Sequence, residues 1–550
     1  MGIFINLLIS KSVTKEEWEK VYGETLELIK HLPFAEGKKI KIHDIDTYCL
    51  VKSEEHPENY GWNNEKTRIG WNTIGDYLSM KTAENYFLPR DLIGNNNVEL
   101  SAGDALLAAI PAYMNLELKN DPLDHTYELW GAKTQGEPYH IHLLSVAALI
   151  EARLGEKALT YGDITRGQFK RAVGIANKYL EKPIELPDRC YPDRLLKRVS
   201  KLPLEPQEQL AVFEEFFLGT KDTSFGTFMS QVYSDDVITE FWKRKFKNCK
   251  IGTTGFDNLI NDYLLWGFSL RELCNYVSYD IGGEGEPDYE KFIIRIMDAK
   301  LHIENKNCAD PLKIDQDEER PYGISKLFAQ FIFAGAKNKK IDRYIPIGEI
   351  RATLNDALSS HCNVDKIIND YLEEEEKNIR INLDSHTTDE EIAELVKNDP
   401  AEAFNQVMDI KRKQLKEEQE KYDIDDYMYL LYYEDGDTIH PVLEKSLANS
   451  MKFLKSLLDE EEYKELITES AKRCCQWLVE NNRCFRIRDT DWDRIFTSIE
   501  NDIKSFGRYY SLFRAKIDND GLLDMCIALL TNDELYSYSE LLMKNMTHEE

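Results

Sequence analysis

The sequence predicts an α+β protein that is mainly α-helical, with an N-terminal α/β domain followed by a large multi-helical region. Strand-like and helix-like segments alternate through the first two hundred residues, and helical periodicity dominates beyond them. The chain has 550 residues, too many for one hydrophobic core, so it should divide into several domains. Polar and proline-containing stretches mark the limits, and we expect an α/β domain at 1–203, a helical domain at 208–304, an acidic helical domain at 322–435 and a C-terminal helical domain at 440–550.

The first fifty residues have the pattern strand, helix, strand. Residues 3–10 form an apolar, strand-like run. Thr14 and Glu17 have the spacing of a capping box, in which each side chain bonds to the backbone N–H of the other residue, so a helix should begin there and end before Pro33. Residues 40–51 are again extended in character. This order is a sound opening for an α/β domain.

The stretch 139–187 is the best-organised part of the chain. Within it, 143–154 is a nearly continuous apolar run closed by Gly155, which predicts a helix buried on most of its circumference. Glu151 interrupts this run. A buried carboxylate there would need a partner, whereas a position at the edge of the buried face would give it access to solvent.

A strand and a second helix should follow. Residues 158–161 have the character of a short strand. Thr165 and Gln168 then form another capping box, which places a helix start at Arg166. Residues 184–186 supply a further short strand. The alternation of helix and strand at this spacing indicates an α/β layer.

The strand pattern fades beyond Tyr191, and helical periodicity takes over. The expected helices lie near 192–199, 207–218, 223–232, 235–247, 255–265, 268–278, 289–303, 324–336, 347–359 and 364–376. The last hundred residues have the pattern of roughly four or five more helices.

Charge and composition limit the class of partner and the compartment. Lys and Arg number 69 against 99 Asp and Glu, a formal net charge of −30, which disfavours nucleic acid and leaves protein as the expected partner. No apolar run approaches the roughly 18 residues that span a bilayer, so no membrane association is expected. The ten cysteines contain no C-x-x-C pair, which is typical of reduced thiols and predicts a cytoplasmic protein.

Standard catalytic and metal-binding signatures are missing. The sequence has no Walker-type phosphate loop, no G-x-S-x-G and no H-E-x-x-H. The segment 518–521 resembles part of a calcium loop, but Lys516 would occupy the first ligand position. Cys474 and Cys475 would point about 100° apart on a helix and do not suit zinc. We therefore predict no metal site, and any cofactor stays unknown.

An enzyme of the metal-dependent or acid–base hydrolase type would have its site around 139–166. His140 and His142 are two residues apart, so in an extended segment their imidazoles face the same way, whereas in a helix they diverge. Asp163 follows a predicted strand and precedes a helix start, where ligands often bind. The alternative for Asp163 is a carboxylate that merely favours the helix N-terminus.

Two tryptophans in a polar stretch are the candidates for recognition. Trp62 and Trp71 each follow a glycine within the loop-like segment 56–71. An indole in such a loop can bind a partner's side chain, or it can turn inward and anchor the loop. With no catalytic signature, the sequence favours a cytosolic protein-interaction or regulatory protein whose partner is a protein.

Overall fold

The structure is a computed structural model of the whole chain. It describes residues 3–56, 69–92, 103–110, 125–247, 249–279, 287–304, 343–383, 402–403, 406, 427–515 and 520–549.

The first sheet has three antiparallel strands with β1 (Phe4–Ser10) in the middle, between β7 (Thr126–Lys133) and β8 (Ala158–Gly162). Because side chains alternate along a strand, β1 serves two cores. Ile5, Leu7 and Ile9 pack with helices α1 (Lys15–Ile29), α2 (Tyr139–Leu154) and α3 (Arg166–Ala176). Leu8 faces the opposite way and belongs to the core of the helices that follow.

The second sheet has five strands, ordered β3 (Ile45–Lys52), β2 (Phe34–Ile42), β5 (Gly70–Asp76) and β4 (Glu55–His56), with β6 (Thr82–Pro89) paired to β5. The named strands of both sheets pair antiparallel, so the helix–strand alternation does not build parallel crossovers here. The extended segment expected at 40–51 is interrupted by a turn at His43 and Asp44, both with positive φ.

Both predicted capping boxes are confirmed. Thr14 Oγ1 accepts from the Glu17 N–H at 3.2 Å, and the Glu17 carboxylate accepts from the Thr14 N–H at 2.8 Å. Thr165 and Gln168 repeat this arrangement at 3.2 and 3.0 Å, so α3 begins at Arg166. The strand expected at 184–186 does not form, because the backbone N–H and C=O of Ile184 bond to the side chain of Asn177 instead.

The middle of the chain is a run of helices that shares a core with the first sheet. The helices are α4 (Pro192–Val199), α5 (Pro206–Phe216), α6 (Thr223–Val232), α7 (Asp235–Lys247), α8 (Thr254–Leu265), α9 (Leu270–Tyr276), α10 (Tyr289–Asp298), α12 (Ile347–Leu358) and α13 (Val364–Leu383). Their buried side chains form one cluster with Leu8, Leu159 and the short 3-10 helix η1 (Ala105–Ala109). The cluster continues from α4 into α13, and the four domain limits stay a prediction.

The C-terminal helices share a core with the second sheet. They are η6 (Tyr427–Tyr432), α16 (Pro441–Ser456), α17 (Glu461–Leu466), α18 (Ala471–Asn481), α19 (Asp489–Asn501), α20 (Phe506–Arg514), α21 (Asp520–Thr531) and α22 (Asp533–Glu549). Their cluster includes Ala35, Leu50 and Met80 from the sheet. The Leu50 N–H also donates to the Ile487 carbonyl at 2.9 Å, in a parallel bridge that adds this segment to the edge of β3.

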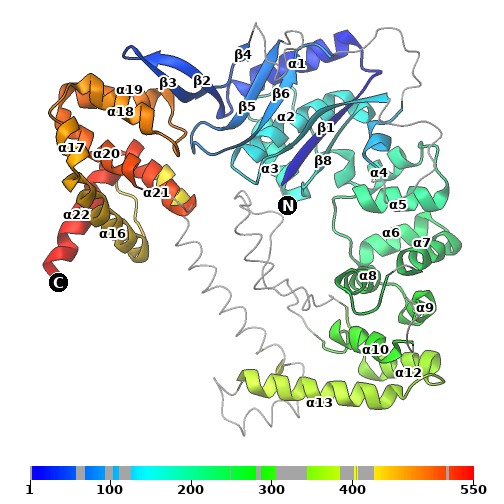
Figure 1. Cartoon of the computed structure of the whole chain (residues 1–550). Helices are drawn as coiled ribbons and strands as arrows, with labels where there is room; N and C mark the ends of the chain where they lie inside the picture. Colours follow the sequence, from blue (N-terminus) through cyan, green and yellow to red (C-terminus); the bar gives the residue numbers. More distant parts are fainter. Residues whose placement is uncertain are drawn as a thin grey trace.

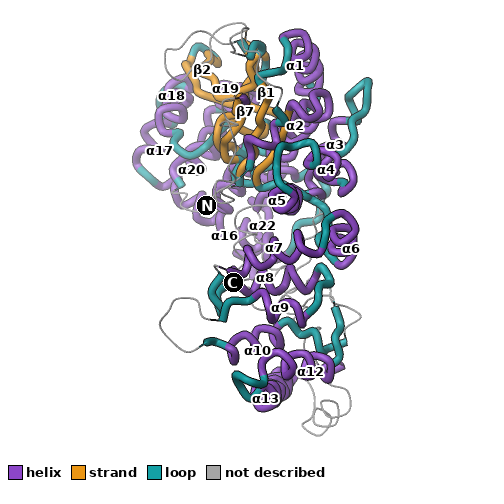
Figure 2. Tube along the Cα trace, turned by 90° about the vertical axis from the view of Figure 1, so that its right-hand side faces the viewer, coloured by secondary structure: helices purple, strands orange, loops and turns teal. Residues whose placement is uncertain are grey.

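The two sheets therefore connect the middle helices to the C-terminal helices. Figure 1 shows helices α4–α13 extending from one side of the sheets and α16–α22 lying on the other, so that the chain forms an arch. In Figure 2 the strands lie at one end, and α10, α12 and α13 lie at the other. The predicted fold class, mainly α-helical with a sheet-containing N-terminal region, is confirmed. In the part of the chain that the structure describes, no helix has the length and apolarity needed to cross a membrane.

Candidate functional site

The two candidate histidines point in different directions because both lie in α2. His140 is buried, and its Nδ1 lies 2.7 Å from Thr134 Oγ1. Burial lowers the pKa of His140 to about 4, so its imidazole is neutral near pH 7. His140 is a core residue that ties α2 to the end of β7.

His142 faces the second sheet. Its Nε2 lies 3.9 Å from Asp76 Oδ2, and its ring meets Phe34 edge-on. Burial, and then the positive charge of Arg171, lower the pKa of His142 to about 4, whereas burial raises the pKa of Asp76. A neutral imidazole beside a largely buried carboxyl group is an arrangement that could exchange a proton.

Asp163 completes the first sheet. It follows β8 directly, and its carboxylate accepts a hydrogen bond from the Phe4 N–H at 2.9 Å. Its own N–H donates to the Phe4 carbonyl at 3.0 Å. His140 lies at the same end of this sheet, because Thr134 bonds to Ile3 there. Among the described residues, however, no hydrogen bond or ion pair that we find joins Asp163 to either histidine.

Trp71 does not form a recognition surface, and that interpretation is corrected here. Its side chain is 0% exposed, stacked on Phe34 at 5.4 Å and edge-on to Trp130 at 6.3 Å. The glycine before it, Gly70, lies so close to the backbone of Leu88 that a Cβ would meet that carbonyl oxygen. Strand β5 is thus pressed against β6, with the indole on the core side. Trp62 lies outside the described residues.

The hairpin between β5 and β6, residues 76–81, connects the sheet to the C-terminal helices. Its turn is stabilised by the Ser79 N–H, which donates to Asp76 Oδ1 at 2.6 Å. Tyr77 donates its hydroxyl hydrogen to Asp489 of α19 at 2.7 Å, and Lys81 Nζ lies 2.5 Å from an Asp524 oxygen of α21. Met80, at φ +58°, packs in the shared core. One short hairpin is therefore fixed to two C-terminal helices.

Exposed apolar side chains occur on the hairpin and on η6 and α21, which pack against each other. Leu78 at the hairpin is 54% exposed and Tyr432 of η6 is 48% exposed. Partial desolvation of Tyr432, and then the nearby negative charges of Asp76 and Asp524, raise its pKa to about 12. Tyr429 of η6 and Leu522 of α21 are also exposed. We call Leu78, Tyr429, Tyr432 and Leu522 the hairpin surface.

The neighbourhood of the hairpin surface is acidic. The loop after η6 carries Glu434, Asp435 and Asp437, all of them exposed. It is a tight turn, because the Glu434 N–H donates to Asp437 Oδ2 at 2.9 Å and Gly436 has φ +92°. The aromatic side chains thus lie beside fixed negative charge.

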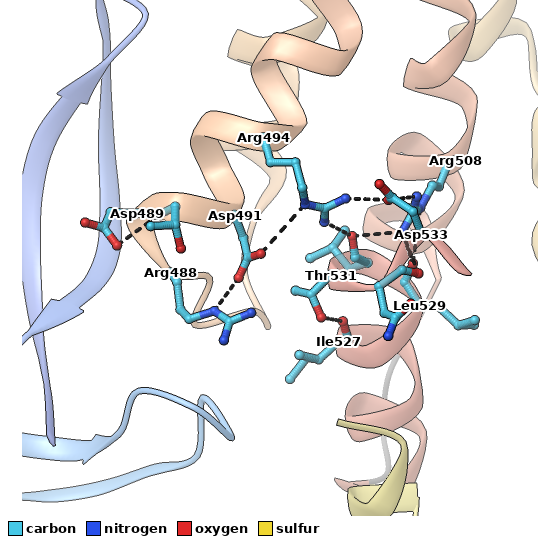
Figure 3. Close-up of polar contacts among 12 residues, drawn as sticks. Arg488, Asp489, Asp491, Arg494, Arg508, Ile527, Leu529, Thr531 and Asp533 are labelled. Atoms are coloured by element: carbon cyan, nitrogen blue, oxygen red, sulfur yellow. Dashed lines mark hydrogen bonds and ion pairs between the residues drawn. The ribbon is translucent and has the colours of Figure 1, made fainter. Parts of the chain in front are cut away.

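A chain of charged side chains supports the helices behind the hairpin. Asp491 lies 2.5 Å from Arg488 and 3.8 Å from Arg494, and Figure 3 shows Arg494 reaching on to Asp533. Arg508 bonds to the same Asp533 and also donates to the carbonyls of Leu529, Leu530 and Asn532. Arg494 also donates to the Leu530 carbonyl at 2.7 Å, so two guanidinium groups satisfy carbonyls at the C-terminal end of α21, where cations are favoured.

Glu151 is fully buried and has partners, which decides between the two interpretations of this residue. Its Oε2 accepts from the Thr160 N–H at 3.0 Å, and its Oε1 lies 3.9 Å from Arg198. Arg198 in turn forms a two-point contact with Asp104, at 2.7 and 2.8 Å. Burial raises the pKa of Glu151 and lowers that of Arg189, its other positively charged neighbour. This network joins α2, η1 and α4.

A second pairing of a carboxyl group with an imidazole lies at β4. His56 Nε2 is 2.5 Å from Glu36 Oε2, and Glu36 is buried in β2. Burial raises the pKa of Glu36, opposed by the contact with His56. Next to them, Glu55 accepts from Tyr22 and is paired with Arg90. These pairs lie at β4, which stands at the end of the strand order of the second sheet.

No group of three or more His, Cys, Asp or Glu side chains that could hold a metal ion occurs among the residues the structure describes. The described cysteines are free thiols, and Cys474 donates to the Leu466 carbonyl at 3.3 Å.

Comparisons with known proteins add no family. No family model matches the chain, and neither a curated protein nor a solved structure matches it.

Proposed function

We propose that this chain is a cytoplasmic protein-interaction or regulatory protein, and that it contacts its partner through the hairpin surface. The observation that carries the proposal is the position of Tyr432. Its ring is about half exposed and lies close to Asp76 and Ser79, in a hairpin fixed to α19 and α21. A rigid, exposed aromatic ring is a favourable anchor, because little side-chain entropy is lost when a partner covers it.

The expected partner is a protein segment that is positively charged and carries an apolar side chain. The acidic turn at Glu434–Asp437 lies directly beyond Tyr432, and the whole chain has a net charge of −30. Such a field attracts a basic segment and speeds its encounter with the surface. The same charge repels the phosphates of nucleic acid, which supports a protein partner.

Site-specific photo-cross-linking tests the proposal. A photoreactive phenylalanine analogue is placed at position 78 or 432 in cells, with position 541 of α22 as the matched control, because Leu541 is 53% exposed against 54% for Leu78. We expect one basic protein to be cross-linked from 78 and 432 but not from 541. The cross-linked protein, once identified and purified, should then bind the purified chain with an affinity that falls as the salt concentration rises. Equal yields from all three positions, or no binding by the purified partner, would contradict the proposal.

A second candidate is acid–base hydrolysis at His142 and Asp76. The observation that favours it is their 3.9 Å separation, with an imidazole that is neutral near pH 7 and can accept a proton. Release of p-nitrophenol from p-nitrophenyl acetate and p-nitrophenyl phosphate, with and without Mn²⁺, tests it. An enzyme at this site should lose its rate in His142→Gln and keep it in His31→Gln. Rates equal to those of buffer for the unmodified protein would exclude hydrolysis of these two esters.

A further inference from the structure

The turn between β2 and β3 places one histidine on a C-terminal helix. His43 and Asp44 have φ of +48° and +63°, the left-handed conformation of a two-residue hairpin turn. Strand β2 and strand β3 both contact α19. The strained turn therefore directs the His43 side chain at α19 and fixes it there.

The imidazole of His43 lies between two carboxylates. Its Nδ1 is 2.9 Å from Glu500 Oε2 and its Nε2 is 2.9 Å from Asp493 Oδ1. The ring meets Phe496 edge-on at 6.0 Å. Asp493, Phe496 and Glu500 are spaced at i, i+3 and i+7, so they form one stripe of α19.

Only the protonated ring satisfies both contacts. A carboxylate accepts hydrogen bonds, so each ring nitrogen must carry a hydrogen, and only the imidazolium ion has two. The two carboxylates raise the pKa of His43, with Glu500 the larger cause. When the ring loses a proton, one nitrogen becomes an acceptor that faces a carboxylate oxygen at hydrogen-bond distance. That contact is then repulsive.

The other titratable and charged groups around this contact do not replace the histidine. On α18, which packs against β3, the Cys475 thiol lies near Glu500, and its pKa is raised to about 12, so it stays neutral. The other charged residues of the turn are Lys41, Asp44 and Asp46. No hydrogen bond or ion pair that we find among the described residues joins these three to Asp493 or Glu500.

We propose that His43 is a pH-sensitive latch that holds the second sheet to α19 and weakens as pH rises. Because the folded-state pKa is raised above the ordinary value of about 6.5, the contribution is fully present below that value and is lost as pH rises through the folded-state pKa. Above that range the C-terminal helices stay attached through the shared core and the hydrogen bond from the Leu50 N–H to the Ile487 carbonyl. The latch therefore adjusts how firmly α19 is held without detaching it.

Two measurements on the full chain test the latch. The first is the titration of the His43 imidazole by NMR, where we expect a midpoint above 6.5 that moves down in Glu500→Gln and in Asp493→Asn. The second is hydrogen exchange in 42–46 and 489–501 at pH 6.0 and 8.5, corrected for intrinsic rates. The unmodified chain should lose protection against exchange at pH 8.5. The loss should be up to about tenfold for each unit by which the folded-state pKa of His43 exceeds 6.5.

The matched variants are His43→Asn and His31→Asn. Asparagine tolerates the left-handed turn, so the hairpin should still form in the first variant. His31 stacks on Tyr179 and serves as the control. We expect exchange in His43→Asn to be fast and independent of pH in these segments, and exchange in His31→Asn to follow the unmodified chain. The latch is overturned by a His43 midpoint at or below 6.5, or by equal pH dependence in both variants.

Discussion

Glu151 and Arg198 lie 3.9 Å apart, with each side chain 4% exposed, at the place where the first sheet meets the middle helices. Glu151 is contributed by α2 and Arg198 by α4. Buried charges are costly unless they are paired, and Arg198, which Asp104 also contacts, supplies positive charge beside Glu151. The pair therefore links α2 to α4 inside the core.

Replacement of Glu151 should test this connection. Glu151→Ala removes the acceptor of the Thr160 N–H and leaves Arg198 and Arg189 with less negative charge, so we expect a loss of about 3–5 kcal/mol of unfolding free energy. Glu151→Gln keeps an acceptor oxygen and should cost less. Urea unfolding of the two variants measures the difference. A cost below about 1 kcal/mol for the alanine variant would mean that the buried pair is not needed.

Trp71→Ala should destabilise the fold without a direct effect on a partner. The indole is wholly buried between Phe34 and Trp130, so its removal should cost about 3–5 kcal/mol. Trp71→Phe keeps a ring against Phe34 and should cost less. The melting temperature of each variant provides the measurement. Loss of partner binding in a Trp71→Phe variant of unchanged stability is the result that would return this residue to a recognition role.

Thr165→Ala should weaken the start of α3. The substitution removes the side-chain acceptor for the Gln168 N–H, and we expect a cost of roughly 0.5–2 kcal/mol in unfolding free energy. Thr165→Ser keeps the hydroxyl and serves as the control. Urea titration of both variants is the test, and equal stability of the alanine and serine variants would refute the capping contribution.

The buried His140 makes stability depend on acid pH. Its folded-state pKa is about 4, below the ordinary value of about 6.5, so its contribution is present above pH 6.5 and is lost as pH falls toward 4. In His140→Asn an amide replaces Nδ1 near Thr134 and cannot titrate. The stability difference between the two proteins should therefore change by about 3 kcal/mol from pH 7 to pH 4. A constant difference across that range would show that His140 does not couple folding to pH.

Local signals in the sequence predicted local structure well. The capping boxes at Thr14 and Thr165 were found because both partners lie three residues apart, where the bonding pattern is fixed. The apolar run at 143–154 predicted a buried helix because apolar side chains on nearly every side of a helix must all be covered. The strand expected at 184–186 was wrong, because the Asn177 side chain satisfies the Ile184 backbone groups that a neighbouring strand would otherwise bind.

The candidate site was not predictable in the same way. Asp76 and His142 meet across 66 residues of sequence, and Tyr77 meets Asp489 across 412. Neither pairing leaves a pattern in a single sequence, because tertiary packing of separate cores brings the residues together. The polar environment of Trp71 was misleading: the surrounding segment is hydrophilic, yet β5 pairs with β2, β4 and β6 and its indole is buried.

The binding affinity of the basic protein cross-linked at position 432 tests the central claim most directly. The double variant Leu78→Ser with Tyr432→Ser removes two exposed apolar side chains of the hairpin surface, and Leu541→Ser removes one of equal exposure on α22. We predict that the double variant binds at least about thirtyfold more weakly by isothermal titration calorimetry, which corresponds to about 2 kcal/mol. Leu541→Ser should bind like the unmodified chain. Equal dissociation constants for all three folded proteins would contradict the assignment of the hairpin surface.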